Sequence, residues 1–172
     1  QLEQKSVFIE SDLFGNIYLS DGNVIYKFNE YFQAQQSYSD FFSGKIQSVD
    51  ATNPMKILVF SKDFMRLTFL NNQMAKQNNP YLLTDWNILL PTAACTSYDN
   101  GFWIYDAMKD VLLRFNASAN KVLESQALSV ITGEKITPDY MREIGGKYVV
   151  LCSKEFGFFV FDKFGTFFKS IP

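Results

Sequence analysis

Residues 15–29 read GNIYLSDGNVIYKFN, two short apolar runs joined by a polar Ser-Asp-Gly-Asn link and ending in Phe28-Asn29. Short apolar runs bounded by Gly, Asn and Asp are typical of β-strands connected by tight turns. The whole chain has a similar composition, because 17% of its residues are aromatic and most of these are Phe or Tyr. Aromatic side chains favour strands, so we expect an all-β protein.

The same pattern returns three more times along the chain. The aligned segments are MKILVFSKDFMRLTFLNNQMAKQ (55–77), GFWIYDAMKDVLLRFNASANKVLESQ (101–126) and KYVVLCSKEFGFFVFDKFGTFFKSI (147–171). The anchor pairs are Phe28-Asn29, Leu70-Asn71, Phe115-Asn116 and Phe161-Asp162, spaced by 42, 45 and 46 residues. Several strands in each unit of about 40–50 residues indicate the blades of a β-propeller.

Each unit is predicted to hold four strands, and the four together one propeller domain over residues 1–172. The predicted blades span residues 5–44, 45–91, 92–136 and 137–172. A leading strand is expected first in each blade, over residues 6–11 in the first. Two apolar strands follow, and then a polar outer strand such as 33–39 or 121–126, because edge strands stay polar to discourage pairing with other chains. Residues 129–140 are expected to form an ordinary loop.

The Asn or Asp of each anchor pair is interpreted as a turn former. Its short side chain can bond the backbone of a tight turn, and the residue tolerates left-handed geometry. A ligand-binding role for the four residues is the alternative, but turn chemistry alone accounts for them. They are Asn29, Asn71, Asn116 and Asp162.

The stretch GNIYLSDGNVIYKFN is similar to the NHL-type propeller repeat, in which a Gly-led apolar strand and an Asp precede a strand ending in Phe-Asp or Phe-Asn. The stretch NGFWIYDAMKDVLLRFN (100–116) repeats this pattern and also resembles the quinoprotein-type repeat. The second unit departs from it, with no leading Gly and with Leu70 in place of Phe. Four units without a strand exchange between the termini predict an open or incomplete ring.

Charge and residue usage exclude several classes of function. A net charge of −2 with a pI near 5.1 argues against a nucleic-acid partner. The chain has no His, which excludes His-based triads and His metal ligands within it. No apolar run is long enough to span a bilayer. Cys95 and Cys152 lie in apolar strands and are expected to be buried thiols, although a disulfide stays open in an exported protein.

Motifs for catalysis are missing. The sequence has no phosphate-binding loop, no dinucleotide fingerprint and no nucleophile elbow, so we expect no enzyme, no catalytic residue, no cofactor and no metal. Residues 20–23 superficially resemble a calcium loop but lack its ligand count and its closing Glu.

Exposed aromatic residues are therefore the better candidates for function. Residues 78–91, NNPYLLTDWNILLP, depart from the blade pattern, and long aromatic connections on a rigid scaffold often bind partners. The alternative is that this segment packs on its own blade as an outer strand. Near the C-terminus, GFFVFDKFGTFF (157–168) reads as a buried strand, a turn and the start of an outer strand. The predicted partner-contact residues are Tyr81, Leu82, Trp86, Phe164 and Phe167.

The chain begins Gln-Leu-Glu-Gln, which we interpret as a mature start left after a signal peptide is removed before Gln1; a fragment cut at this point is the alternative. The abundance of Phe, Lys, Asn and Gln resembles exported proteins of Bacteroidota, and within that group the plug-type periplasmic subunits of the type IX secretion translocon. The resemblance implies a periplasmic interaction module that does not itself span the membrane and plugs a large outer-membrane barrel complex. The alternatives are a carbohydrate- or peptidoglycan-binding propeller using Tyr98, Trp103 and Tyr105, and a lactonase- or quinoprotein-like enzyme.

Overall fold

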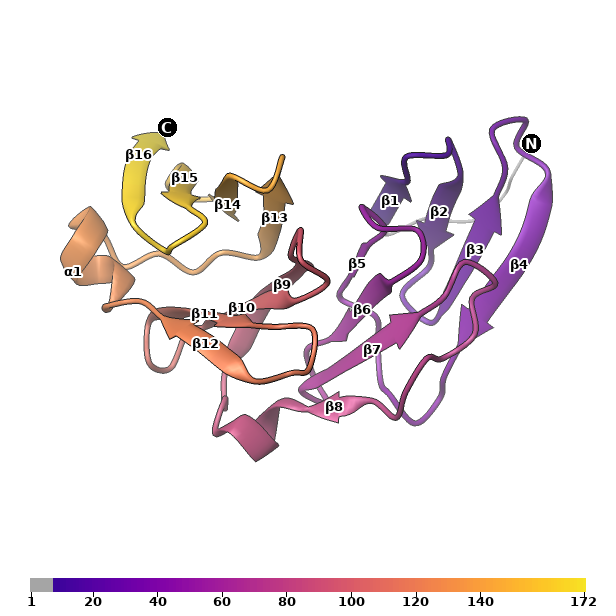
Figure 1. Cartoon of the computed structure of the whole chain (residues 1–172), viewed down its shortest axis with the longest axis horizontal. Coiled ribbons are helices and arrows are strands. Elements are labelled where there is room, and N and C mark those ends of the chain that lie inside the picture. Colours follow the sequence, from indigo (N-terminus) through magenta and orange to yellow (C-terminus); the bar gives the residue numbers. More distant parts are fainter. Residues whose placement is uncertain (1–7) are drawn as a thin grey trace. The chain divides into compact units, whose positions relative to one another are not determined.

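The computed structural model describes residues 8–172, and within them sixteen strands form four antiparallel sheets of four strands each. Each sheet is a meander of four consecutive strands and is called a blade here (Figure 1). The strands of blade 1 are β1 (Phe8–Ser11), β2 (Ile17–Ser20), β3 (Val24–Phe28) and β4 (Ala34–Ser39). Those of blade 2 are β5 (Ser48–Asp50), β6 (Ile57–Ser61), β7 (Arg66–Leu70) and β8 (Tyr81–Leu82). Those of blade 3 are β9 (Pro91–Thr96), β10 (Phe102–Asp106), β11 (Val111–Phe115) and β12 (Lys121–Glu124). Those of blade 4 are β13 (Tyr140–Ile144), β14 (Tyr148–Ser153), β15 (Gly157–Asp162) and β16 (Phe167–Ile171).

This arrangement confirms the all-β prediction and the four-stranded blades. Within the described residues no sheet combines strands from the two ends of the chain, which agrees with the expectation that the termini exchange no strand. The leading strand of blade 1 was expected over residues 6–11. Its first two residues, and the Gln-Leu-Glu-Gln start, lie outside the described part of the chain.

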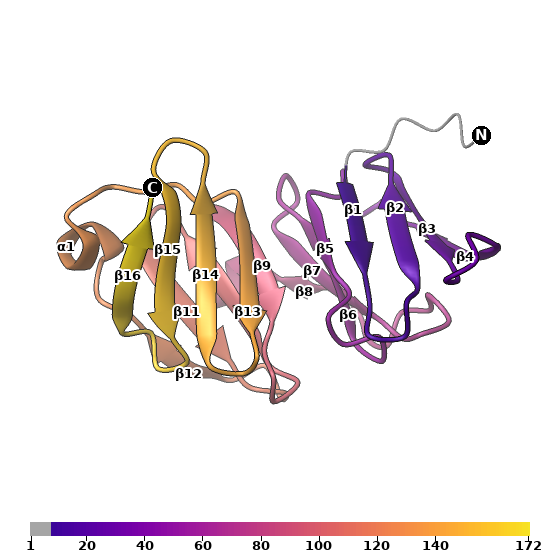
Figure 2. The same cartoon turned by 90° about the horizontal axis from the view of Figure 1, so that it is seen from above.

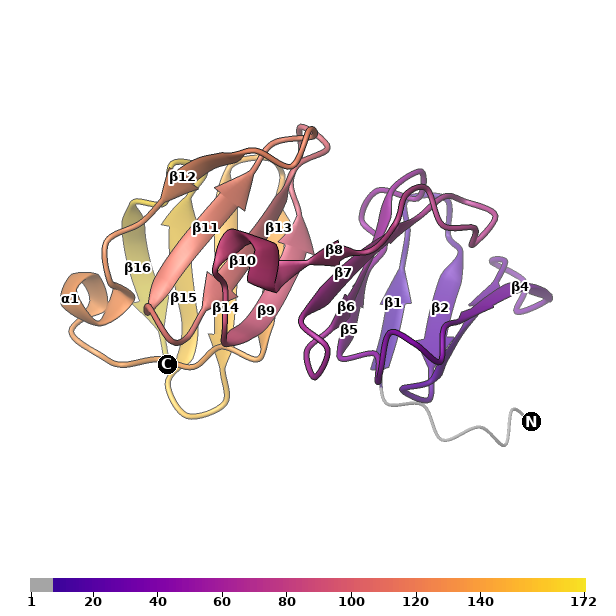
Figure 3. The same ribbon diagram turned by 90° about the horizontal axis from the view of Figure 1, so that it is seen from below.

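The chain forms two compact units, one ending at Leu83 and the other comprising Thr84–Pro172. The first unit holds blades 1 and 2, and the second holds blades 3 and 4 (Figures 2 and 3). The single propeller domain over residues 1–172 stays a prediction.

The core of each unit lies between its two blades. In the first unit, Tyr18 and Ile25 of blade 1 pack with Val49, Ile57 and Val59 of blade 2. The core of the second unit joins side chains of the middle and leading strands of blades 3 and 4. Its largest members are Trp103, Tyr105, Phe159 and Phe161. Burying so many large side chains is what holds each pair of blades together.

Burial follows the position of a strand within its blade. All residues of β6 and β10 are buried, because these strands have neighbours on both sides. Five of the six residues of β4 are exposed, and β12 has no buried residue. The polar outer strands predicted for these two blades are therefore confirmed.

The four anchor residues make the same turn. In every blade the anchor Oδ1 accepts the backbone N–H groups two and four residues later, at 2.8–3.0 Å. The third residue after each anchor has a positive φ: Phe32, Met74, Ala119 and Gly165. The turn-forming role predicted for the anchors is confirmed.

Two connections differ from a plain strand and loop. Residues 129–140 were predicted to be a loop, but α1 (Leu128–Thr132) covers the first four of them. The helix forms because the Asp110 carboxylate accepts the Ser129 backbone N–H at 2.8 Å, a cap supplied from the β10–β11 turn. Blade 2 ends in the two-residue strand β8, and the 3₁₀-helix η1 (Leu83–Trp86) follows it.

Cys95 and Cys152 are both thiols rather than a disulfide. Cys95 is buried as expected, whereas Cys152 on β14 is only half-buried. Burial, together with the nearby Asp139 carboxylate, raises the pKa of the Cys152 thiol. Low reactivity follows, because the thiolate is the reactive form.

No helix in residues 8–172 has the length and the apolar character that crossing a membrane requires.

Candidate interaction surfaces

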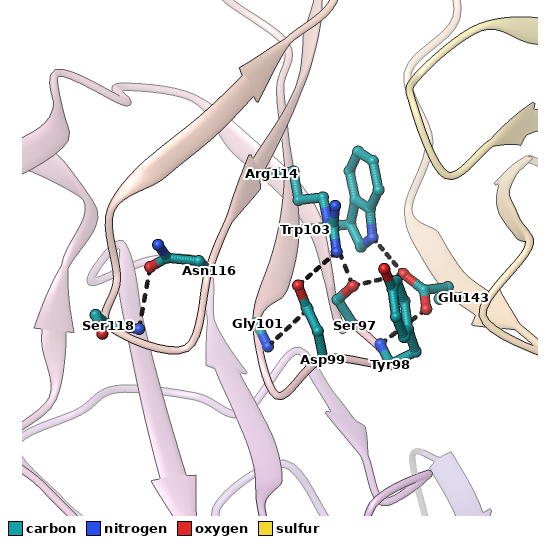
Figure 4. A network of polar contacts seen from close by, with 9 residues as sticks. All are labelled: Ser97, Tyr98, Asp99, Gly101, Trp103, Arg114, Asn116, Ser118 and Glu143. Carbon is teal, nitrogen blue, oxygen red and sulfur yellow. Dashed lines mark hydrogen bonds and ion pairs between the residues drawn. The ribbon is translucent and has the colours of Figure 1, made fainter.

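A buried carboxylate ties blade 4 to blade 3. Glu143 projects from β13, and its Oε2 accepts hydrogen bonds from Trp103 Nε1 at 2.6 Å and Ser97 Oγ at 2.7 Å (Figure 4). Its Oε1 accepts the backbone N–H of Tyr98 at 2.8 Å. All three donors belong to blade 3 or to its β9–β10 turn. Donors matched to both oxygens compensate for the cost of burying the charge.

Arg114 orders the same turn from the other side. Its guanidinium forms an ion pair with Asp99 at 2.7 Å and lies 5.3 Å from the ring centroid of Tyr98. Asp99 Oδ1 in turn accepts the Gly101 backbone N–H at 3.1 Å (Figure 4). Both charges of this pair are therefore used inside the protein.

Tyr98 is held at the surface by this network. Its side chain is 58% exposed, although its backbone is bonded to Glu143. Gly146, with a φ of +64°, lies directly against it, and a Cβ there would come within 3.2 Å of the Tyr98 Cβ. A side chain at position 146 would thus displace the ring. The result is an exposed aromatic ring on an ordered support.

The β15–β16 turn brings two more residues to Tyr98. Lys163 Nζ lies 5.8 Å from the Tyr98 ring centroid and 5.2 Å from that of Phe164. The backbone N–H of Lys163 donates to the Lys147 carbonyl at 2.9 Å, which fixes this turn to the β13–β14 turn. Phe164 is 67% exposed. A lysine therefore lies among two exposed aromatic rings.

The face of blade 4 opposite blade 3 carries several exposed apolar side chains, and the register also places Arg142 and Lys169 on it. Strand alternation and register place Tyr140, Ile144, Tyr148 and Phe158 on it, and the Phe168 ring lies 5.6 Å from that of Tyr148. We call these five residues the blade 4 outer face. All five are exposed, whereas every residue of β10 in blade 3 is buried. Blade 4 thus exposes apolar side chains on a face that is buried in the middle strand β10 of blade 3.

The five residues predicted from the sequence fall into two groups. Three of them are half-buried: Tyr81 and Phe167 pack on their own blades, and Trp86 packs on blade 3. Tyr81 meets Phe69 edge-on at 5.9 Å, Trp86 lies 4.5 Å from Phe115, and Phe167 lies 5.5 Å from Phe161. Leu82 and Phe164 are exposed. For partner contact, Leu82 and Phe164 remain the stronger predictions.

Two of the three aromatics considered for sugar binding are in the core. Trp103 and Tyr105 are buried and present no ring face to solvent, so only Tyr98 could act as a platform. The Tyr105 hydroxyl lies 2.5 Å from Asp110 Oδ1, and burial together with this carboxylate raises the pKa of the phenol. Tyr105 therefore stays neutral and structural.

Sequence reasoning missed an aromatic surface in the first unit. Phe41 and Phe42 are largely exposed in the β4–β5 connection, and Phe64 lies over Gly44, where a Cβ would collide with the ring. A groove of about 290 Å³ adjoins these residues, with Lys45 and Asp63 in its wall. The adjacent pair Phe41-Phe42 in a polar loop was the available signal.

Acidic side chains do not gather as they would around a metal. Among residues 8–172, no group of three or more His, Cys, Asp or Glu could hold an ion. The segment that resembles a calcium loop is a β-turn, in which Asp21 Oδ1 accepts the backbone N–H groups of Asn23 and Val24.

No protein-family model and no curated protein matches this sequence. Solved structures do resemble it, and they are β-propellers. Virginiamycin B lyase from Staphylococcus aureus, in a catalytically inactive variant in which one His is replaced by Ala, matches all of this chain with a TM-score of 0.69 at 10% identity. A protein of unknown function from Bacteroides caccae matches 97% of it with a TM-score of 0.67 at 10% identity. BamB from Moraxella catarrhalis matches 96% of it with a TM-score of 0.60 at 9% identity.

The chain spans 57% of the length of the lyase, 68% of that of the Bacteroides protein and 51% of that of BamB. At these identities the likeness shows the fold alone. The four blades are therefore β-propeller blades, and function has to be argued from the surfaces of this chain.

Proposed function

We propose that this chain is a non-enzymatic protein-interaction module of the periplasm. It docks on a large outer-membrane complex and plugs the periplasmic side of a protein-secretion pore. The observation that carries the interaction role is the blade 4 outer face, five exposed apolar side chains on one side of an ordered sheet. Exposed apolar side chains gathered on one face mark interaction sites in soluble proteins, and Arg142 and Lys169 lie among them here.

The docking role is also supported by the order of the surrounding structure. The Glu143 network and the anchor turn at Asp162 fix the backbone beside this face, so a partner would meet a preformed surface. Preorganisation lowers the entropy lost on binding, which is how a modest apolar area can give useful affinity. The export and the pore-plugging role rest on the sequence resemblance alone.

The proposal that the chain is not an enzyme rests on what its buried acids already do. Glu143 joins two blades, Asp110 bonds Tyr105 and caps α1, and neither is left to act on a substrate. The 172 residues contain no His, and the similar lyase variant is inactive after loss of one His. Stoichiometric Ca²⁺ or Zn²⁺ in the purified protein would contradict this part of the proposal.

Co-purification tests the docking role. The affinity-tagged chain, produced in a Bacteroidota cell, should retain an outer-membrane barrel protein after mild detergent extraction. Replacing Phe158 and Phe168 together by Ser should reduce the retained barrel protein at least tenfold, because both rings lie on the proposed contact face. The control Tyr31→Ser removes an even more exposed ring from a turn of blade 1, and this variant should still retain the barrel protein.

The outcome that contradicts the proposal is a monodisperse chain that carries no envelope protein while its thermal unfolding shows it folded. Fractionation of the same cells tests the location. The chain is expected in the periplasmic and outer-membrane fractions, and recovery from the cytoplasm would reject export.

A further inference from the structure

Lysines and aromatic rings lie near one another on blade 4 and on the adjoining β9–β10 turn of blade 3. Lys163 lies between Tyr98 and Phe164, its backbone joins that of Lys147, and Lys169 Nζ lies 5.9 Å from the Phe168 ring centroid. We call these the Lys163 edge: Tyr98, Lys147, Lys163, Phe164, Phe168 and Lys169. Cations and aromatic rings side by side can bind one ligand through charge and apolar contact together.

The lysines of this edge have no ion-pair partner among the residues that the structure describes. None of its three lysines forms a salt bridge with any residue of 8–172. The neighbouring acids are committed elsewhere: Asp162 holds its turn, Asp99 pairs with Arg114, and Glu143 is buried under its three donors. The three lysines and Arg114 face these three carboxylates, so this part of the surface keeps one positive charge in excess on a chain whose net charge is −2, which favours an anionic partner here.

We propose that the Lys163 edge binds an acidic segment of a partner polypeptide that also carries aliphatic or aromatic side chains. This proposal rests on the proposed function and names the chemistry of the partner. A carboxylate of the segment would pair with Lys163, and an adjacent apolar side chain would lie against the rings of Tyr98 and Phe164. Charges at the rim of such a contact mainly set specificity and the rate of association.

The arrangement favours a short acidic segment over a nucleic acid or an anionic bilayer. A long polyanion or a charged membrane would meet the net negative charge of the whole chain, whereas a short segment meets only this edge. The Tyr98 ring is also fixed by Gly146 and Glu143 instead of being free to insert into lipid.

Fluorescence anisotropy with a defined probe tests this inference. The probe is a labelled 12-residue peptide in which Glu and Asp alternate with Phe and Leu, titrated with the full chain at 50 and 300 mM NaCl. Binding should weaken at least tenfold in Lys163→Glu and several-fold at the higher salt, because exposed charges are screened. The control Lys135→Glu reverses an exposed lysine of the α1–β13 loop and should bind like the unmodified chain.

Three results would overturn the inference: no binding of the peptide, equal binding by Lys163→Glu, or binding of phosphatidylglycerol vesicles or single-stranded oligonucleotides in its place. Folding of each variant is checked by circular dichroism. The proposed function has a separate test, because Lys163→Glu can be co-purified from cells. If it retains the barrel protein fully, the docking role stands and the acidic-segment inference fails.

Discussion

Glu143 is a buried carboxylate that connects blade 4 to blade 3. Its two oxygens meet an indole N–H, a hydroxyl and a backbone N–H, all from blade 3, and its side chain is buried. Removing the carboxylate would leave these donors without an acceptor in a site with little water. Leaving a buried donor without an acceptor costs more free energy than an average hydrogen bond contributes to stability.

Replacing Glu143 should therefore destabilise the protein strongly. We expect Glu143→Ala to lower the free energy of unfolding by about 3 kcal/mol, and Glu143→Gln by about half of that, since the amide keeps one acceptor oxygen. Urea unfolding at pH 7 measures both. The control Glu155→Gln changes an exposed side chain and should stay within about 0.5 kcal/mol. If Glu143→Ala lowers the free energy of unfolding by less than about 1 kcal/mol, Glu143 does not hold the two blades together.

The hydrogen bonds of Asp12, in the β1–β2 turn of blade 1, make the stability of the protein depend on pH in the acid range. Burial raises its pKa, but four hydrogen bonds, from Asn16 and Tyr18 side chains and the backbone N–H groups of Phe14 and Asn16, outweigh burial and lower it. A carboxyl group with a lowered folded-state pKa contributes stability above its unfolded pKa, near 3.8. That contribution is lost as the pH falls through the folded-state pKa.

The loss of stability as the pH falls below about 4 should therefore depend on Asp12. We expect Asp12→Asn to lose about 1 kcal/mol at pH 7 and to show a shallower fall in stability between about pH 4 and pH 2 than the unmodified chain. The urea concentration at the midpoint of unfolding, measured for both proteins across this pH range, tests the prediction. Parallel curves for the two proteins would show that Asp12 has no special part.

At the scale of the element, the anchor turn is the unit that repeats. Asn29, Asn71, Asn116 and Asp162 make the same two backbone contacts, and the third residue after each has a positive φ. Blade 4 has Gly at that position, and blade 3 has Ala119 with a φ of +60°. An L-residue in this region is strained by about 1–2 kcal/mol.

Ala119→Gly should therefore stabilise the protein. Relief of strain outweighs the extra freedom of Gly in the unfolded chain, leaving a gain of about 0.5–1 kcal/mol. Ala117→Gly, two positions earlier in the same turn and without a positive φ, should lose stability instead. Thermal unfolding of the pair gives the comparison, and two losses would contradict the turn geometry.

The strands and the anchor turns could be predicted because their signals are local. Apolar runs and turn residues are recognised within short stretches of sequence, and these stretches recur at a spacing of 42–46 residues. The helix α1 was missed because its cap comes from Asp110, in a turn that precedes it by 18 residues in the chain. The N-cap position is Ala127, whose side chain cannot accept a hydrogen bond.

The candidate surfaces were predicted less well, because exposure depends on distant packing. Phe164 and Phe167 look alike in the sequence, yet Phe164 is exposed at a turn while Phe167 packs on Phe161. Tyr98 needs Glu143, 45 residues away, to hold it at the surface, and the Phe41-Phe42 pair has no repeat counterpart. Contacts between residues so far apart in the sequence cannot be predicted from a local pattern.

At the scale of the whole molecule, the proposed docking role belongs to one surface of a propeller scaffold. The likeness to the solved structures shows the fold of that scaffold alone. The proposed contact surface is the blade 4 outer face with the lysines beside it. Docking through that surface is the central claim.

Hydroxyl-radical footprinting in the presence of solubilised Bacteroidota outer-membrane complexes tests this claim most directly. Oxidation of Tyr148, Phe158, Phe164 and Phe168 should fall at least fivefold when the complexes are added, while Tyr31 stays equally reactive. Unchanged oxidation of all four blade 4 residues, or protection of Tyr31 alone, would contradict the account.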